Sequence, residues 1–380
     1  MKNIAVITGS RAEYGLLKLL IQAIAEDTNF NLQLVVTGMH LSPEFGLTYK
    51  EIEQDGFAIA QKVNCHLTSD TAEAITKSMG TAMIGFADVY KELNPFLIVL
   101  LGDRSEIFAA AAAAMIKGTP IAHIHGGETT EGSYDEAQRH AITKMSYLHF
   151  TSTEVYRKRV IQLGEAPERV FNVGAIGIDS IKKLPLLSKD DFEKSIDFKL
   201  NKKNILITFH PVTLENQTAE VQFRELLKSV DKIKDAVLFF TKPNSDKDGR
   251  IIIKMIDECH KRAKDVIKQC STKHGLFASA GKEGYNAVWA RDSMISFLGA
   301  SLVKEKMFKS TFRQSLIILA ENQGRTGQIP NAVDKFSKRK PHVDFASIDS
   351  SLWFIIGHYI YKKRYNDNSL FKKYKKSIEK

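Results

Sequence analysis

The segment AHIHGGETTEGSYDEAQRH, residues 122–140, gathers histidine, glycine and carboxylate side chains in spacings that permit chemistry. Three interpretations are open: a metal site, an acid–base site, or the start of an ordinary capped helix. Neither H-x-x-x-H nor H-E-x-x-H, spacings that place two imidazoles on one ion, occurs in the segment. We therefore predict no metal, and we expect His123 to be a hydrogen-bonded histidine inside a strand.

The capped-helix interpretation accounts for part of this segment. Ser133 followed by Glu136 fits a capping box, with Asp135 in the first turn of the helix. The pair Gly126–Gly127 permits a sharp turn and a close approach of the backbone, which places Glu128 on a loop. A capped helix gives Glu128 no role, so the acid–base interpretation stays open.

A repeated unit positions these residues: an apolar run, a small or polar loop, then an amphipathic helical stretch. Such alternation predicts an α/β fold with mostly parallel sheets covered by helices on both faces. The predicted strands are residues 3–8, 31–38, 96–101, 119–125 and 147–152 and, after a charged connection at about 178–203, residues 204–209 and 236–241. We place two Rossmann-like domains at residues 1–178 and 179–355, followed by a basic C-terminal helix or tail at 356–380.

Charged and polar residues directly follow several of these predicted strands. They are Arg11, Asp103, Arg104, Glu128, His210 and Asn244. Ligands of open parallel sheets bind beyond the carboxyl ends of the strands. Asp103 and Glu128 are 25 residues apart, the length of one strand–helix–strand unit, so a right-handed crossover brings both to one edge. The pattern predicts a charged rim on each domain, and a cleft if the two rims face each other.

The composition is that of a globular protein: of 380 residues, 43% are hydrophobic and 26% charged. The N-terminus runs directly into an apolar strand without a signal peptide, and three scattered cysteines suit a reducing cytoplasm. The formal charge of +10 includes eight Lys or Arg in the last twenty residues, which we interpret as a solvated helix face. We predict no nucleic-acid or membrane partner, a homo-oligomer (dimer or tetramer), and an anionic small-molecule substrate.

Six motifs resemble a known family in order and spacing over roughly residues 1–255. They are GSRAEYG, VTGMHLSPEFG, LGDRSE, HIHGGETTEGSYDEAQRHAITKMSYLHF, QLGE and FHPVTLEN. The chain is similar in these motifs to the hydrolysing UDP-N-acetylglucosamine 2-epimerases of bacterial sialic-acid synthesis. The resemblance implies two facing Rossmann-like domains in the glycosyltransferase-B arrangement, with the ligand in the cleft and the C-terminal helix packed on the first domain. It also implies conversion of UDP-N-acetylglucosamine and water to N-acetylmannosamine and UDP, without metal or nicotinamide cofactor.

The reaction explains why carboxylates are expected. UDP leaves C-1 and the C-2 proton is removed, which gives a glycal; water then adds with inversion at C-2. Acid–base groups of different pKa suit these two steps. The resemblance assigns them to Asp103, Glu128 and Asp135, without deciding which carboxylate serves which step.

Further roles follow from the same resemblance, each with a structural alternative. Arg11, Arg104 and His210 are expected to stabilise the leaving diphosphate, and Asn244 to contact the nucleotide. Arg11 also fits a surface charge, while His210 and Asn244 also fit turn residues. Similarly, Asp103 fits a helix cap, and His125 either contacts the substrate or orients Glu128.

The chain departs from the family in its second half. The family carries a Ser-rich loop and a glutamate that opens a helix and holds the nucleotide. Here the region reads SMISFLGASLVKEK, where Ser301 and Glu305 are the expected counterparts. Two alternatives follow: the same chemistry on a UDP-diacetamido-trideoxyhexose of a legionaminic-type pathway, or a nucleotide-sugar-binding protein with reduced or lost catalysis.

Overall fold

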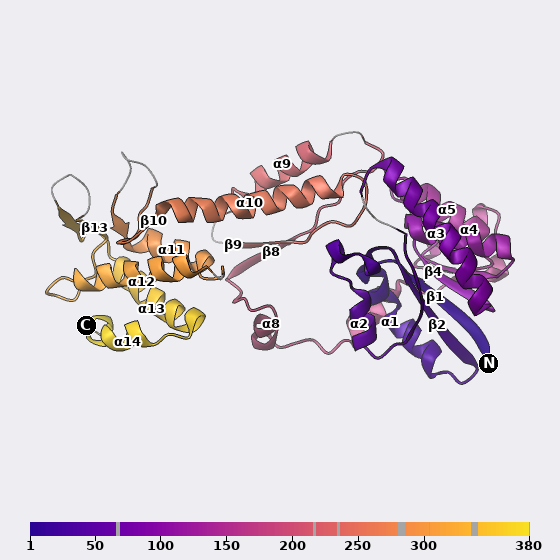
Figure 1. Ribbon diagram of the computed structural model, residues 1–380, viewed down its shortest axis with the longest axis horizontal. Coiled ribbons are helices and arrows are strands. Elements are labelled where there is room, and N and C mark those ends of the chain that lie inside the picture. The colour runs from indigo at the N-terminus through magenta and orange to yellow at the C-terminus, as the bar shows by residue number, and fades with distance from the viewer. Residues whose placement is uncertain are drawn as a thin grey trace. The chain divides into compact units, whose positions relative to one another are not determined.

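The computed structural model describes residues 1–379 except 66–68, 216–217, 234–235, 280–285, 304 and 336–340 (Figure 1). It divides into two compact units, Met1–Lys254 and Met255–Lys380. The predicted boundary at residue 178 follows from the pattern of strands and helices rather than from compactness, and it stays a prediction.

A seven-stranded parallel sheet forms the core of the first unit. Its strand order is β3-β2-β1-β4-β5-β6-β7. The strands are β1 (Lys2–Thr8), β2 (Phe30–Thr37), β3 (Ile59–Val63), β4 (Leu97–Leu101), β5 (Ile121–Ile124), β6 (Leu148–Thr151) and β7 (Val170–Asn172). Their central members are nearly continuous apolar runs, as expected of parallel strands buried on both faces. The predicted α/β class with a doubly wound parallel sheet is confirmed.

Helices cover both faces of this sheet (Figure 1). The helices and short 3-10 turns are α1 (Arg11–Glu26), η1 (Gly38–Leu41), η2 (Pro43–Phe45), α2 (Tyr49–Gln54), α3 (Ala72–Leu93), α4 (Ser105–Lys117), α5 (Asp135–Met145), α6 (Glu154–Gln162), η3 (Pro167–Arg169), α7 (Ile176–Lys183) and α8 (Lys189–Ser195). On one face, side chains of α3, α4 and α5 form a core with Ile7 and Leu100. On the other, side chains of α1 and α2 form a core with Val6 and Leu101. The alternating side chains of each strand therefore feed two separate cores.

Helix α1 begins earlier than the sequence pattern indicates. The motif GSRAEYG reads as a loop, yet the helix starts at Arg11. Ser10 is its N-cap: the Ser10 hydroxyl accepts a hydrogen bond from Glu13 N, and the Glu13 carboxylate accepts one from Ser10 N at 2.9 Å. This reciprocal capping box satisfies amide groups at the helix start. It also fixes Glu13 at the carboxyl edge of β1.

The predicted strands at 204–209 and 236–241 form the parallel pair β8 (Lys203–Ile207) and β9 (Ala236–Phe240), with α9 (Ala219–Val230) between them in sequence. The segments that follow these two strands contact the seven-stranded sheet's carboxyl edge. Leu214 N donates to Gly132 O at 3.0 Å, and Arg104 Nη2 donates to Ser245 Oγ at 3.0 Å. Two distant parts of the sequence therefore meet at the predicted rim.

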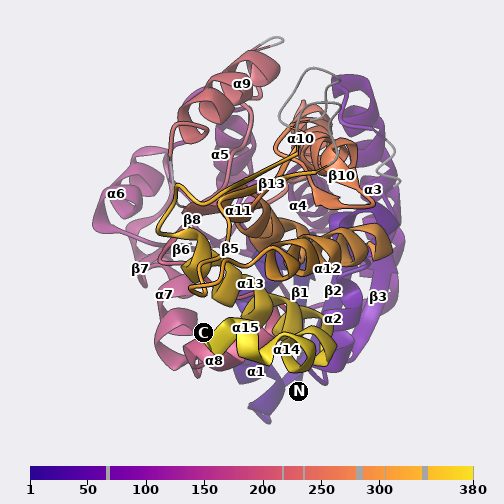
Figure 2. The same ribbon diagram turned by 90° about the vertical axis from the view of Figure 1, so that its left-hand side faces the viewer.

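The second unit is built differently. Its elements are α11 (Ala290–Ala300), α12 (Lys306–Glu321), α13 (Ser350–Tyr365), α14 (Ser369–Lys373) and α15 (Lys375–Glu379), with the short strands β10 (Ser271–Thr272), β11 (Gly275–Leu276), β12 (Val288–Trp289), β13 (Ala332–Asp334) and β14 (His342–Asp344); α10 (Gly249–Cys270) leads into it. The strand pairs here are antiparallel. Helices α11, α12 and α13 pack together (Figure 2). The stacked rings of Phe297 and Phe312 lie in the core that these helices form. The tail helices pack within this unit, and their predicted contact with the first domain stays a prediction.

Within the described ranges, no helix combines the length and the apolar composition that crossing a bilayer requires.

Candidate active site

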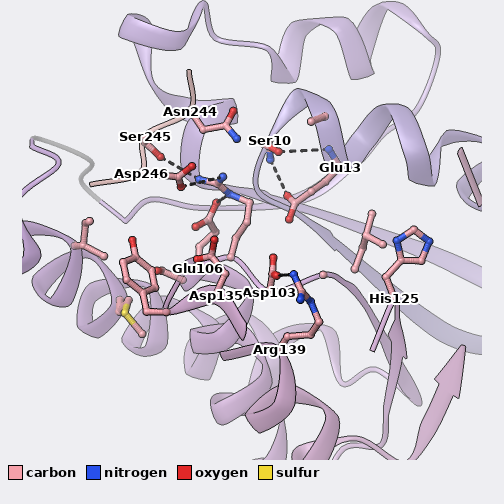
Figure 3. Close-up of a pocket in the computed structure, with 18 of the residues that line it drawn as sticks. Ser10, Glu13, Asp103, Glu106, His125, Asp135, Arg139, Asn244, Ser245 and Asp246 are labelled. Atoms are coloured by element: carbon pink, nitrogen blue, oxygen red, sulfur yellow. Dashed lines mark hydrogen bonds and ion pairs between the residues drawn. The ribbon is translucent and has the colours of Figure 1, made fainter. Parts of the chain in front are cut away.

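A cavity of about 280 Å³ opens at the carboxyl edge of the seven-stranded sheet. Residues that follow β1, β4 and β5 line it, together with residues of α3 and α5 and of the segment after β9. Strand β1 leads to β2 on one side of the sheet and β4 leads to β5 on the other, so the cavity lies at the topological switch point. Six predicted residues line it: Asp103, Arg104, His125, Glu128, Asp135 and Asn244. Figure 3 shows the carboxylate side chains of Glu13, Asp103, Glu106, Asp135 and Asp246 around this cavity.

Asp103 follows β4 and is held by an arginine that the sequence did not single out. Its carboxylate forms an ion pair with Arg139 of α5 (Figure 3). Arg139 also donates to Glu128 O at 2.9 Å and to Thr130 Oγ1 at 3.0 Å. Asp103 does not cap α4, since the N-cap of α4 is Arg104. A guanidinium partner favours the ionised form of a carboxylate.

Glu128 follows β5 through a turn that needs glycine. Gly127 has φ 81°, and a Cβ there would lie 2.7 Å from the carbonyl oxygen of Tyr156. The predicted sharp turn is confirmed, but the close approach is to the protein's own backbone. Glu128 Oε1 accepts from Ser152 Oγ at 2.6 Å and lies 3.7 Å from His125 Nδ1. Its position is therefore set by the turn and by the hydrogen bond from Ser152.

His125 has the left-handed φ of 66°, which is uncommon outside glycine and asparagine. Burial lowers its pKa, while the Glu128 charge acts in the opposite direction. Its Nε2 is buried and has no hydrogen-bond partner among the described residues. The imidazole therefore lines the cavity close to Glu128, at a distance too long for a hydrogen bond.

Asp135 is the first residue of α5, as the sequence indicated, but the predicted capping box is wrong. The N-cap is Tyr134, in helical conformation, and Glu136 accepts from Thr130 N at 2.9 Å. Ser133 Oγ instead accepts from Asp135 N at 3.2 Å. Burial raises the pKa of Asp135, against the lowering effect of the Ser133 hydrogen bond. Burial therefore makes the ionised form of Asp135 less favourable than that of an exposed aspartate.

Arg104 connects the sheet edge to the segment after β9. Its Nε donates to Glu106 Oε1 at 2.8 Å, and its Nη1 lies 3.6 Å from Asp246 Oδ1. Asn244 lines the same part of the cavity, beside Ser245 and Asp246 (Figure 3). The motif GDRSE had indicated Arg104 but not its partner Glu106.

Four predicted residues lie elsewhere. Arg11 is the first residue of α1, with a side chain 73% exposed that pairs with Glu51. His210 is exposed in the segment after β8, and neither it nor Arg11 lines the cavity. Their roles toward a diphosphate stay predictions.

Ser301 and Glu305 belong to the second unit. Ser301 is the C-cap of α11, and its amide donates to Phe297 O. The Glu305 carboxylate pairs with Lys264 at 2.9 Å and Lys268 at 3.1 Å. The carboxyl end of a helix carries a partial negative charge, which is unfavourable for a phosphate. Contact of these residues with a nucleotide stays a prediction.

His123 behaves as predicted. It is fully buried in β5, with Nε2 2.8 Å from Gly102 O and Nδ1 3.2 Å from Thr143 Oγ1. In the parts of the chain that the structure describes, no three His, Cys, Asp or Glu side chains gather in a group that could hold a metal ion.

A doubly wound sheet with a cavity lined by carboxylates and guanidinium groups at its switch point is typical of α/β proteins that bind a small-molecule ligand there. A family model described as UDP-N-acetylglucosamine 2-epimerase matches residues 22–280. The chain belongs to this family. A second model, described as amylo-alpha-1,6-glucosidase, matches residues 261–380, which lie within the second compact unit. This division agrees with the loss of the family's motifs after about residue 255.

Relatives and a solved structure agree with the family. The chain is 37% identical over 334 residues to GDP/UDP-N,N'-diacetylbacillosamine 2-epimerase (hydrolyzing) of Campylobacter jejuni, which covers 88% of this chain and 84% of that protein. It is 42% identical over 253 residues to polysialic acid biosynthesis protein P7 of Escherichia coli, covering 66% of this chain and 64% of that protein. The UDP-GlcNAc 2-epimerase of Methanocaldococcus jannaschii, solved with UDP-GlcNAc and UDP, shares the fold with a TM-score of 0.56 at 20% identity, over 67% of this chain and 70% of that one.

Proposed function

We propose that the chain is a hydrolysing 2-epimerase that converts UDP-N-acetylglucosamine and water to N-acetylmannosamine and UDP. One observation carries the proposal: Asp103, Glu128 and Asp135 line a single cavity at the switch point of the sheet. Family membership supports a UDP-sugar as the ligand, and the Methanocaldococcus jannaschii relative was solved with such a ligand.

The environments of the three carboxyl groups suit three different tasks. Asp103, paired with Arg139, stays ionised and stabilises positive charge at C-1 as the bond to UDP breaks. Glu128, oriented by Ser152, takes the C-2 proton, which completes the glycal. Asp135, whose pKa burial raises, gives a proton to C-2 from the opposite side. The ionised Asp103 carboxylate takes the proton that the attacking water releases as its oxygen bonds to C-1.

The electron pair of the broken C-1–oxygen bond leaves with UDP, whose negative charge needs cationic partners. Arg104 lines the cavity and is held rigidly by Glu106 and Ser245. Asn244, on the segment after β9, also lines the cavity, which supports the proposed contact with the nucleotide part of the ligand. Arg11 and His210 remain candidates for the same diphosphate.

A second substrate is favoured by a specific observation. The Campylobacter jejuni relative, which aligns over most of this chain, is named for N,N'-diacetylbacillosamine, a 2,4-diacetamido-trideoxyhexose. The cavity also has apolar lining residues, among them Leu16, Ile75 and Met79. A 6-methyl group in place of a hydroxymethyl group would suit that lining.

Parallel reactions with the two UDP-sugars test the proposal. We expect UDP release from UDP-N-acetylglucosamine together with N-acetylmannosamine, identified by NMR of the sugar product. A much higher kcat/KM for the UDP-diacetamido sugar than for UDP-N-acetylglucosamine would show that the diacetamido sugar is the substrate instead. Binding of both without turnover would favour the alternative of a nucleotide-sugar-binding protein, and release of N-acetylglucosamine would indicate simple hydrolysis.

A further inference from the structure

Glu13 presents an unused carboxyl oxygen to the cavity. The residue is 7% exposed and lines the cavity beside Ser10 (Figure 3). Its Oε2 accepts two backbone hydrogen bonds, from Gly9 N at 2.7 Å and Ser10 N at 2.9 Å. Its Oε1 is buried and lacks a hydrogen-bond partner among the residues described. Buried polar atoms are rarely left without a hydrogen bond, so we expect this oxygen to form one with a ligand bound in the cavity.

Negative charge surrounds this carboxyl group. Glu106 lies beside it, because an added Cβ on Gly9, whose amide binds Glu13 Oε2, would overlap the Glu106 carboxylate. Arg104 is the cation of this cluster, and it is shared with Glu106 and with Asp246. Like charges that share one counter-ion disfavour full ionisation of the group.

The other titratable neighbours add no positive charge near pH 7. Burial lowers the pKa of His40, on η1, to about 4, so its imidazole is neutral. Burial raises the pKa of the Cys65 thiol, after β3, to about 11, so the thiol is neutral too. Asp135 adds a further carboxyl, and the Arg139 charge is paired with Asp103. On α1 itself, Arg11 points to Glu51 at the surface.

We propose that Glu13 is a further ligand-binding residue: its Oε1 carries a proton and donates a hydrogen bond to a phosphate oxygen of the UDP-sugar, so that diphosphate binding takes up a proton. This inference rests on the proposed function for the identity of the ligand. The two backbone amides fix Oε2 as an acceptor, which leaves Oε1 as the atom that holds the proton.

The proton affinity of the free site supports this role. Burial, and then the charge of Glu106, raise the pKa of Glu13 to about 7. A bound anion next to Oε1 makes the ionised carboxylate less favourable, and the protonated carboxyl group can donate a hydrogen bond to that anion. Both effects raise the pKa of Glu13 further. At pH 8 the free site is therefore mostly ionised and the complex mostly protonated. Uptake of close to one proton per UDP is expected at that pH.

Titration calorimetry with UDP at pH 8, in two buffers of different ionisation enthalpy, measures this uptake directly. Glu13→Gln keeps an oxygen for the two amides and an NH₂ donor for the phosphate, but it does not titrate. We expect it to bind UDP with uptake lower by about one proton than the wild type. Comparison of the two proteins removes any contribution from the phosphate of UDP itself. Glu26→Gln, on the exposed side of the same helix, is the matched control and should behave as the wild type.

A second measurement needs no variant. An infrared difference spectrum of the wild type with and without UDP should gain the carbonyl stretch of a protonated carboxyl group. Equal proton uptake in wild type and Glu13→Gln, or no new carbonyl band, would overturn the role of Glu13 and leave the proposed function standing. Failure of the wild type to bind UDP would overturn the proposed function and this inference together.

Discussion

Asp103 and Arg139, 36 residues apart in the chain, form an ion pair at the carboxyl edge of the sheet. The same guanidinium holds the backbone carbonyl of Glu128 at 2.9 Å. One side chain on α5 thereby sets the positions of two carboxylate residues that follow neighbouring strands. The geometry of the candidate active site therefore depends on the N–H groups of the planar Arg139 guanidinium.

Arg139→Lys should lower kcat by about 10- to 100-fold with a smaller change in KM. Lysine keeps the charge but not the planar fork, and small displacements of reacting groups are costly. Steady-state kinetics check this, with Arg157→Lys as the control, because Arg157 binds Glu154 and the Val170 carbonyl outside the cavity. Equal kinetics for Arg139→Lys and the wild type would show that Arg139 does not position the carboxylates.

Asp103→Asn and Glu128→Gln should each lower kcat by at least ~10²-fold, the scale of a lost acid–base group. Circular dichroism should be unchanged, since both residues lie on loops at the sheet edge. Glu131→Gln is the matched control: this glutamate is exposed on the same loop as Glu128 and does not line the cavity. A variant that retained near-normal kcat would remove its residue from the mechanism.

Gly127→Ala should destabilise the protein by about 1–3 kcal/mol, the cost of a non-glycine residue held in strained backbone, here with a close contact to Tyr156 O. Gly15→Ala is the opposite case, because nothing lies within 4 Å of its added Cβ inside α1. It should stabilise the protein by about 0.5–1 kcal/mol. Thermal unfolding of the two variants checks the pair, and a stable, fully active Gly127→Ala variant would contradict the turn described here.

Stability should fall as pH rises through the range in which Glu13 ionises. Its pKa in the folded protein is about 7, above its ordinary value of 4.5. Between these values the folded state holds more protons than the unfolded state, so stability decreases with rising pH and levels off above about pH 7. The loss relative to Glu13→Gln should be on the order of 3 kcal/mol between pH 4 and 8.

Unfolding curves of wild type, Glu13→Gln and Glu26→Gln across this range measure the effect. The difference between Glu13→Gln and the wild type should grow in favour of the variant as pH rises, while Glu26→Gln follows the wild type. A difference independent of pH would mean that folding leaves the pKa of Glu13 unchanged.

Much of the first unit could be predicted, because parallel strands are apolar runs and their carboxyl ends share one edge. This logic placed Asp103 and Glu128 together. Arg139 was missed because its role depends on contacts across the fold, although Asp135, Arg139 and Thr143 share the helix spacing of one face. Glu13 was missed because GSRAEYG was interpreted as a loop, although Ser10 and Glu13 have the spacing of a capping box.

The second unit was harder to predict for a physical reason. Its strands are two or three residues long and antiparallel, so they leave little periodic signal in the sequence. Its core is formed mainly by helices, with Phe297 and Phe312 stacked at its centre. The resemblance places Phe297 in the region of the family's phosphate-binding loop. In the structure Phe297 is instead a buried core residue of α11. The assembly into a dimer or tetramer stays a prediction.

An NMR time course of the wild type with UDP-N-acetylglucosamine in D₂O follows the hydrogen at C-2 through the reaction. Elimination and rehydration remove the C-2 proton and return one from solvent. The wild type is therefore expected to form N-acetylmannosamine with deuterium at C-2, together with UDP. The Asp103→Asn variant is expected to form no product on the same time scale. N-acetylmannosamine that retains protium at C-2 would contradict the acid–base role given to Asp103, Glu128 and Asp135.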